Sequence, residues 1–155
     1  MSLEELLENI KHLFGFLFEE YDFSITYTFA RSYPIEIRVG LETNCLPVKL
    51  LFIHEWATAL LIGNKDADFA SSGGWYSIQD LIDFMEQRPK RWLPAKLQIP
   101  YNQFLVTNLQ QIAHEFYEHR ELIFSLFNSE KMNWVENYQS YITNEVRRRY
   151  PSMPR

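Results

Sequence analysis

The spacing of apolar residues in the first part of the chain is that of an amphipathic helix. Between Ser2 and Tyr21 large apolar side chains recur every three or four residues, which places them on one helix face. Ser2 and Glu5 have the spacing of a capping box, in which both side chains bind free backbone N–H groups. Gly15 weakens the helix by about 1 kcal/mol relative to Ala, and we interpret it as a point of close packing. The predicted stripe is Leu3, Leu6, Leu7, Ile10, Leu13, Phe14, Leu17, Phe18 and Tyr21.

From residue 22 the apolar side chains alternate with polar ones, which is typical of strands with one buried face. This alternation predicts strands over residues 23–29 and 35–41. Residues 48–53 and 56–62 are almost continuously apolar. Periodicity leaves the second of these runs open, as a strand or a short helix. We favour an antiparallel meander of four strands, because the connections are too short for the crossovers of a parallel sheet.

The longest helical pattern covers residues 103–128 and contains neither Gly nor Pro. Its predicted buried face consists of Leu105, Leu109, Ile112, Phe116, Ile123 and Leu126. A shorter helix is expected over 78–85, since Ser77 and Asp80 repeat the capping-box spacing. Three prolines within 88–100 indicate an irregular connector, and the apolar periodicity of 131–149 predicts a last helix.

These patterns together predict the fold class. We expect a single α+β domain over residues 1–155, in which an antiparallel sheet of about four strands packs against an N-terminal helix and a long central helix. A further C-terminal helix completes the prediction. The sequence shows no internal repeat, low-complexity segment or domain boundary.

Composition and charge narrow the classes of function. Aromatic residues make up 16% of the chain, and they indicate either a core built from rings or an exposed contact surface. The net charge of −5 disfavours nucleic acid as a partner, because a phosphate backbone would be repelled. Two basic clusters, at 88–91 and 147–149, are interpreted as solvated helix ends.

The cysteine content and the apolar runs bear on location. Cys45 is the only cysteine, which excludes an intramolecular disulfide. The N-terminus is acidic and amphipathic, unlike a signal peptide, and no apolar run reaches the roughly 20 residues that span a bilayer. We therefore expect a cytoplasmic protein that does not bind membranes.

The run His114–His119, HEFYEH, suggests the zinc-binding motif His-Glu-x-x-His. That motif needs two histidines four residues apart, whereas these are five apart and differ by roughly 140° around a helix. They cannot both bind one ion from an unbroken helix. We interpret His114 with Glu118, and Glu115 with His119, as exposed pairs four residues apart, with His119 at the border of the apolar face.

The loop at 63–76 has part of the spacing of a calcium-binding loop. Asn64, Asp66 and Asp68 occupy alternating positions, like the first ligands of an EF-hand loop. The Gly needed at the sixth position is Phe69, and the Glu needed at the twelfth is Trp75. We therefore expect a solvated, mobile loop with neither metal nor cofactor.

Four short segments carry a resemblance in layout: FEEYDFSITY (18–27), EIRVGLE (36–42), YSIQDLIDF (76–84) and NW (133–134). Their order resembles that of small uncharacterised bacterial proteins, including immunity proteins of polymorphic toxin systems. The resemblance implies a stoichiometric cytoplasmic inhibitor without catalytic residues. It transfers no binding residues, because such families bind through divergent surfaces.

The sequence favours a non-enzymatic protein-binding domain with another protein as partner, and an immunity-like inhibitor is one form of it. Two alternatives remain: a small metal-dependent hydrolase using His114, Glu118 and His119, or a protein that binds an apolar ligand between sheet and helices. The predicted partner-binding residues are Asp66, Asp68, Phe69, Trp75 and Tyr76.

Overall fold

The structure, a computed structural model, describes residues 1–128 and 133–151. The helices of this part of the chain are α1 (Leu3–Leu13), α2 (Gly15–Tyr21), α3 (Ile78–Met85), α4 (Tyr101–Ser125) and α5 (Val135–Arg149). The strands are β1 (Ser24–Ser32), β2 (Ile35–Glu42), β3 (Val48–His54), β4 (Thr58–Asn64) and β5 (Trp75–Ser77). The predicted α+β class is confirmed.

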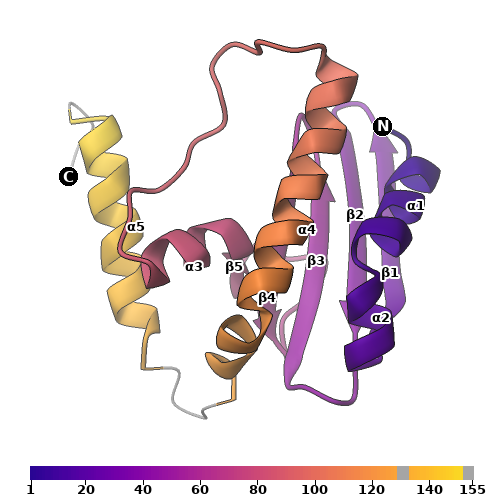
Figure 1. Ribbon diagram of the computed structural model, residues 1–155, viewed down its shortest axis with the longest axis horizontal. Coiled ribbons are helices and arrows are strands. Elements are labelled where there is room, and N and C mark those ends of the chain that lie inside the picture. Colours follow the sequence, from indigo (N-terminus) through magenta and orange to yellow (C-terminus); the bar gives the residue numbers. More distant parts are fainter. Residues whose placement is uncertain (129–132, 152–155) are drawn as a thin grey trace.

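The sheet is an antiparallel meander in the order β1-β2-β3-β4-β5, with each strand beside its neighbour in sequence (Figure 1). The run that the sequence left open is strand β4, because residues 58–64 pair along their length with β3. The sheet has five strands, whereas the sequence predicted about four, because the short β5 pairs with Leu61–Gly63. A strand of three residues is too short to show a periodicity in the sequence.

Helices α1, α2 and α4 lie over one face of the sheet, whereas α3 and α5 lie beside its β5 end (Figure 1). The predicted buried face of α4 is confirmed from Leu105 to Ile123, although Leu126 is only half-buried. Burying a side chain such as Leu or Phe stabilises the fold by about 1.5–3 kcal/mol. Helix α4 therefore holds the centre of the core, whose fully buried members include Leu6, Leu17, Leu50, Phe52, Leu60, Ile62, Leu109 and Phe116.

The N-terminal helical segment is broken, which corrects the prediction of a single helix. Ser2 Oγ accepts a hydrogen bond from the Glu5 N–H at 3.1 Å, so the predicted cap is present. The break falls at Phe14, whose φ of −112° is not helical and whose ring packs edge-on to Phe52, with centroids 4.9 Å apart. Gly15 follows the break, and a Cβ there would meet nothing within 4 Å. This residue therefore marks the interruption and not a close contact.

A bulge in β1 overturns the predicted alternation of that strand. The register with β2 shifts between Ile25 and Tyr27, and Tyr27 lies opposite Gly40. One extra residue in a strand turns all later side chains to the other face. Phe23 is therefore buried in the core, whereas Tyr27 faces away from the helices.

The loop between β4 and β5 folds back over the face of the sheet that the helices leave free. Phe69 is 8% exposed, and its ring stacks on Tyr27 with centroids 5.3 Å apart. Arg38 Nη1 donates to the Phe69 carbonyl at 2.8 Å, and Lys49 Nζ donates to the Ala67 carbonyl at 2.9 Å. The sequence predicts a solvated, mobile loop, but apolar packing and two hydrogen bonds fix the loop against the sheet.

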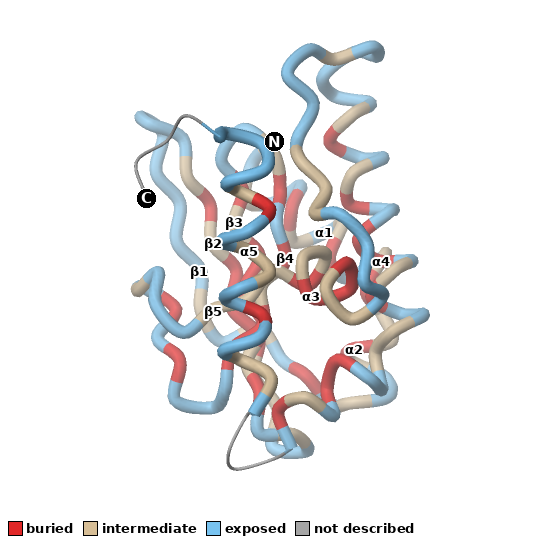
Figure 2. The backbone as a smooth tube through the Cα atoms, turned by 90° about the vertical axis from the view of Figure 1, so that its left-hand side faces the viewer, coloured by how far each residue is buried: buried red, intermediate tan, exposed pale blue. Residues whose placement is uncertain are grey.

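Residues 86–100 form the predicted irregular connector between α3 and α4, and none of them is fully buried (Figure 2). Among the described residues, no helix is both long and apolar enough to cross a membrane.

Candidate functional site

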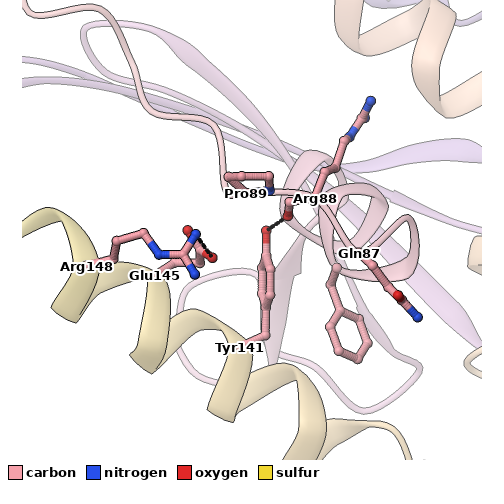
Figure 3. A pocket seen from close by; sticks show the side chains of 7 residues that line it. Gln87, Arg88, Pro89, Tyr141, Glu145 and Arg148 are labelled. Atoms are coloured by element: carbon pink, nitrogen blue, oxygen red, sulfur yellow. Dashed lines mark hydrogen bonds and ion pairs between the residues drawn. The ribbon is translucent and has the colours of Figure 1, made fainter.

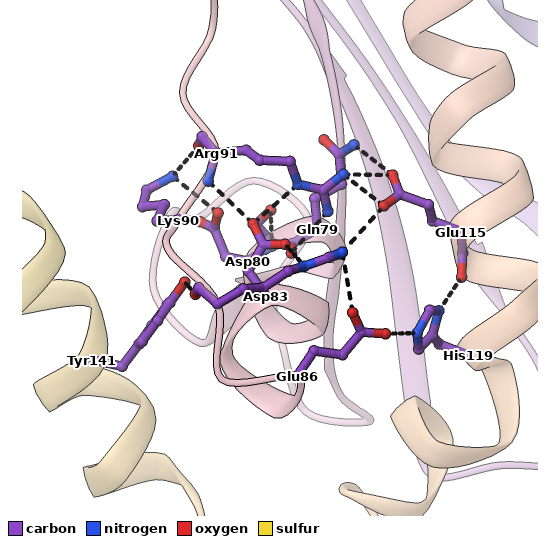
Figure 4. A network of polar contacts seen from close by, with 11 residues as sticks. Gln79, Asp80, Asp83, Glu86, Lys90, Arg91, Glu115, His119 and Tyr141 are labelled. Atoms are coloured by element: carbon purple, nitrogen blue, oxygen red, sulfur yellow. Dashed lines mark hydrogen bonds and ion pairs between the residues drawn. The ribbon is translucent and has the colours of Figure 1, made fainter.

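A network of ionic contacts joins α3, the connector and α4 (Figure 4). Its centre is Asp83, which is 0% exposed. Arg88 Nε lies 2.9 Å from one Asp83 oxygen, and Arg91 Nε lies 3.1 Å from the other. Arg91 Nη1 also reaches both oxygens of Glu115 on α4, at 2.6 and 2.8 Å. The connector is therefore tied to both helices through two arginines.

The interpretation of residues 88–91 as a solvated helix end is wrong. Besides the two arginines, Lys90 Nζ pairs with Asp80 Oδ1 at 2.9 Å. Burial raises the pKa of Asp80, although Lys90 opposes that shift. Burial lowers the pKa of Arg91, but its hydrogen bonds to Asp83 and Glu115 outweigh this and raise it. Glu115 is 24 positions from Arg91 in sequence, so no local pattern predicts the contact.

The HEFYEH run is divided between two environments. His114 is exposed and lies 3.7 Å from Glu118, as predicted. His119 is part-buried, and its Nδ1 lies 2.8 Å from the Glu115 backbone oxygen while Nε2 contacts Glu86 Oε1 at 2.5 Å. Burial lowers the pKa of His119, but these contacts outweigh it and raise the pKa. The predicted side-chain pair of Glu115 with His119 is wrong, because the Glu115 carboxylate binds Arg91.

The network offers little of what acid–base or metal chemistry needs. Within residues 1–128 and 133–151, no group of three His, Cys, Asp or Glu side chains is placed to hold a metal ion. The carboxylates of Asp83, Glu86 and Glu115 each contact Arg88 within 3.6 Å. Arginine side chains therefore compensate the charges of these carboxylates, and the network connects elements of the fold.

Beside the network lies a cavity of about 660 Å³, hereafter the β4 cleft, lined by Ala57, Thr58 and Ala59 on one side and by connector residues Lys90–Pro94 on another. Phe104 and Asn108 of α4 close a further side, together with Arg149 and Tyr150 at the end of α5. Arg149 and Lys90 both lie over the ring of Trp92, at 4.7 and 4.5 Å from its centroid. The sequence did not point to this cleft, because its lining comes from five separate segments.

At one end of the sheet, exposed aromatic and aliphatic side chains form what we term the end surface: Tyr33, Ile35, Trp56 and Tyr101. Their exposed fractions are 93%, 45%, 45% and 37%. Pro34, Ile35, Glu55, Trp56 and Tyr101 surround a depression of about 410 Å³. The residues come from the β1–β2 turn, the β3–β4 turn and the start of α4, which Figure 1 shows at the same end of the molecule. The Tyr101 hydroxyl donates to the Trp56 carbonyl and so joins two of these segments.

The five predicted partner-binding residues do not share one surface. Asp66 and Asp68 are exposed, and Asp68 Oδ1 accepts a hydrogen bond from the Ala70 N–H at 2.9 Å. Phe69 is buried and stacks on Trp75, with centroids 5.7 Å apart. Tyr76 instead packs against Trp134 and against Tyr138 of α5. That these five residues contact a partner stays a prediction.

A further hollow of about 500 Å³ separates the end of α3 from α5 (Figure 3). Tyr141 closes part of it by donating a hydrogen bond to the Arg88 carbonyl at 2.8 Å. Burial raises the pKa of Tyr141 to about 12, so the phenol is neutral at physiological pH. Glu145 and Arg148 form an ion pair at 3.3 Å on the same helix. The hydrogen bond from Tyr141 to Arg88 thus joins α5 to the segment that follows α3.

No protein-family model, curated protein or solved structure matches the chain. The resemblance to immunity proteins therefore stays a prediction.

Proposed function

We propose that the chain is a non-enzymatic protein-binding domain that contacts its partner through the end surface. The observation that carries the proposal is the exposure of Ile35, Trp56 and Tyr101 around one depression, with the exposed Tyr33 directly before Pro34, which also lines it. Contiguous exposed apolar residues at one place on a soluble protein are typical of interaction sites. Tyr and Trp are also the residue types that most often dominate binding energy at protein interfaces.

The enzyme alternative has weaker support. The acidic groups next to His119 are engaged with Arg88 and Arg91, and His119 itself contacts Glu86. A general base or nucleophile must reach a substrate, which these contacts oppose. The apolar-ligand alternative is also less well supported, because charged and amide side chains share the lining of the β4 cleft with its aromatic rings.

An immunity-like inhibitor is one form that this function would take, with a toxin as the partner. The resemblance in layout supports that form, and the geometry supports the wider class of protein-binding domain. Stoichiometric inhibition needs no catalytic residue, which agrees with a surface composed of contact residues.

The test compares Tyr33→Lys with Leu122→Lys. Both residues are highly exposed, at 93% and 61%, so neither change disturbs the core. Leu122 lies 21 positions after Tyr101 on α4, about 32 Å along the helix, and so serves as the matched control. Each variant is immobilised, and proteins retained from a lysate of the native cells are quantified by mass spectrometry.

We expect a partner that wild type and Leu122→Lys retain equally and that Tyr33→Lys retains at least about tenfold less. A contact residue of the dominant kind contributes 2 kcal/mol or more, and about 1.4 kcal/mol corresponds to a factor of ten. If Tyr33→Lys and Leu122→Lys retain the partner equally, the partner does not bind through the end surface.

A further inference from the structure

The edge of the sheet is open where β4 begins. Strand β5 pairs with Leu61, Ile62 and Gly63 only, and the register ends at the pair Leu61 with Ser77. Helix α3 begins immediately afterwards at Ile78, so the chain turns away before it reaches the first residues of β4. Within the described ranges, no strand lies beside residues 58–60 on that side.

This open edge faces the β4 cleft. Thr58 and Ala59 both line the cavity, together with residues of the connector. Unpaired N–H and C=O groups along a strand edge are a template for a further strand from another chain. Adding such a strand is a recurring way in which domains bind extended peptides.

We infer that the β4 cleft accepts an extended acidic segment of the partner protein, which adds to the sheet beside residues 58–60. The inference rests on the proposed function, since it specifies how a bound partner would occupy a second site. The open edge of three residues is about 10 Å long at roughly 3.3 Å per residue. A cleft of about 660 Å³ offers room beside it for side chains of the added segment.

The charges of the cleft favour an acidic segment. Its charged lining residues are Asp80, Lys90, Arg91 and Arg149, which sum to +2 (three cations minus one anion) in a chain of net charge −5. Lys90 and Arg91 are engaged by carboxylates of the network. Arg149 has no carboxylate within ion-pair distance among the described residues, and it lies over Trp92. A carboxylate of the bound segment would give this guanidinium its partner.

The β4 cleft is also continuous with the end surface. Phe104 lines the cleft, and its ring lies 5.3 Å from that of Trp56, centroid to centroid. Trp56 in turn packs against Tyr101 at 6.0 Å. A partner seated on the end surface would therefore lie next to the cleft.

A peptide fits the open edge better than a nucleic acid does. Both could contact cations and stack on Trp92, but only a peptide supplies alternating N–H and C=O groups that match a strand edge. The net charge of −5 further opposes a phosphate backbone. An oligonucleotide is therefore used as a competing probe in the test.

The test is an NMR titration of the full chain, labelled with nitrogen-15. The probes are an acetylated and amidated octapeptide of alternating Val and Asp, its Val and Lys counterpart, and an octamer of thymidylate. We expect the acidic peptide alone to shift the amide resonances of Thr58 and Ala59 and the indole resonance of Trp92. Unmoved amides with the acidic peptide would overturn the inference, as would equal shifts with either other probe.

Two variants test the role of charge. Arg149→Glu should weaken binding of the acidic peptide at least about tenfold, because it replaces attraction in the cleft with repulsion. Arg147→Glu changes the net charge equally, but Arg147 is an exposed residue of the same helix turn and does not line the cleft. It should bind like wild type. An equal effect of the two variants would show only a long-range influence of charge and would overturn the specific contact.

Backbone pairing is tested with peptides methylated on alternate amide nitrogens. Only every second residue of a strand directs its N–H toward a given neighbour, so methylation of one alternate set should abolish binding while methylation of the other preserves it. If both methylated peptides bind like the parent, the contact is not an added strand.

The outcomes separate this inference from the proposed function. Loss of partner capture by Tyr33→Lys, together with an acidic peptide that leaves Thr58 and Ala59 unmoved, keeps the end surface and refutes strand addition. A peptide that adds beside β4 while Tyr33→Lys captures the partner normally refutes the end surface and keeps the cleft.

Discussion

The best-defined ionic contacts of this protein centre on one buried carboxylate. Asp83 is fully buried between Arg88 and Arg91, and Glu115 is held by the same arginines. Removing one partner of a buried ion pair typically costs about 3–5 kcal/mol, because a buried charge is left uncompensated. Because the side chains of Arg88 and Arg91 are partly exposed, the loss of one of them should destabilise the fold by less than this, whatever the chain binds.

His54 gives a pH-dependence that can be measured. It is 0% exposed, and its Nδ1 lies 3.0 Å from Thr58 Oγ1, while Nε2 has no hydrogen-bond partner among the described atoms. Burial lowers the pKa of His54 below 6.5 in the folded state. Below about pH 6.5 the unfolded chain therefore binds more protons at this position, and the free energy of unfolding falls as the pH falls.

We expect His54→Gln to have a smaller loss of unfolding free energy between pH 7 and pH 5.5 than wild type. One group contributes a slope of at most about 1.4 kcal/mol per pH unit. The control is His119→Gln, whose effect has the opposite sign: the raised pKa of His119 adds stability below pH 6.5, which is lost as the pH rises through the folded pKa. Urea unfolding at several pH values measures both slopes. Equal slopes for His54→Gln and wild type would show that His54 is not held neutral.

At the scale of elements, strong periodicity identified helices and long strands but did not predict their breaks. The buried stripe of α4, the helix α3 with its Ser77 cap and the connector were predicted from local patterns. The bulge at Thr26 was not, because it depends on pairing with β2 and not on the alternation of residues 23–29. Nor was β5, whose three residues are specified by the adjacent strand.

The candidate surfaces were less predictable than the fold. The end surface combines residues 33, 35, 56 and 101, and the β4 cleft combines segments up to 93 positions apart (Ala57 to Tyr150). Within the sequence, each of these segments looks like an ordinary part of a turn, strand, connector or helix. Only tertiary packing brings them together, so local spacing could not have identified either surface.

The contact between Gly40 and Phe69 provides a test at the scale of elements. A Cβ built on Gly40 would lie 2.5 Å from a Phe69 ring carbon, far inside van der Waals contact. We expect Gly40→Ala to displace the β4–β5 loop from the sheet and to lower the free energy of unfolding by about 1–3 kcal/mol, the usual range for overpacking. Chemical denaturation and the fluorescence of Trp75, which stacks on Phe69, measure the two effects.

The double variant Gly40→Ala/Phe69→Leu is the control for that change. A smaller side chain at 69 leaves room for the new methyl group, so the cost of Gly40→Ala should be lower in the Phe69→Leu background than in wild type. If the cost is the same in both backgrounds, it arises from the backbone of β2 and not from the contact with the loop.

For the whole molecule, the distribution of charge distinguishes two docking hypotheses. The loop carboxylates Asp66 and Asp68 follow Asn64, which lies six residues along β4 from Thr58, or about 20 Å. The change Asp66→Lys/Asp68→Lys moves the net charge from −5 to −1, because each reversal adds two. If the partner binds the loop through these carboxylates, as the sequence predicted, capture weakens at every salt concentration.

Strand addition at the β4 cleft leads to the opposite result. At 0.15 M salt the screening length is about 8 Å, so charges that do not line the cleft, such as those of Asp66 and Asp68, have little influence on an acidic peptide bound in it. At 0.01 M salt the screening length is about 30 Å, and the less negative variant should bind that peptide more tightly than wild type does. We therefore expect Asp66→Lys/Asp68→Lys to match wild type at 0.15 M salt and to exceed it at 0.01 M, measured by titration with the acidic octapeptide. Weaker capture of the partner by the double variant at both concentrations would instead assign the acidic loop to the contact, because only a direct interaction lost with the carboxylates persists when the long-range field is screened.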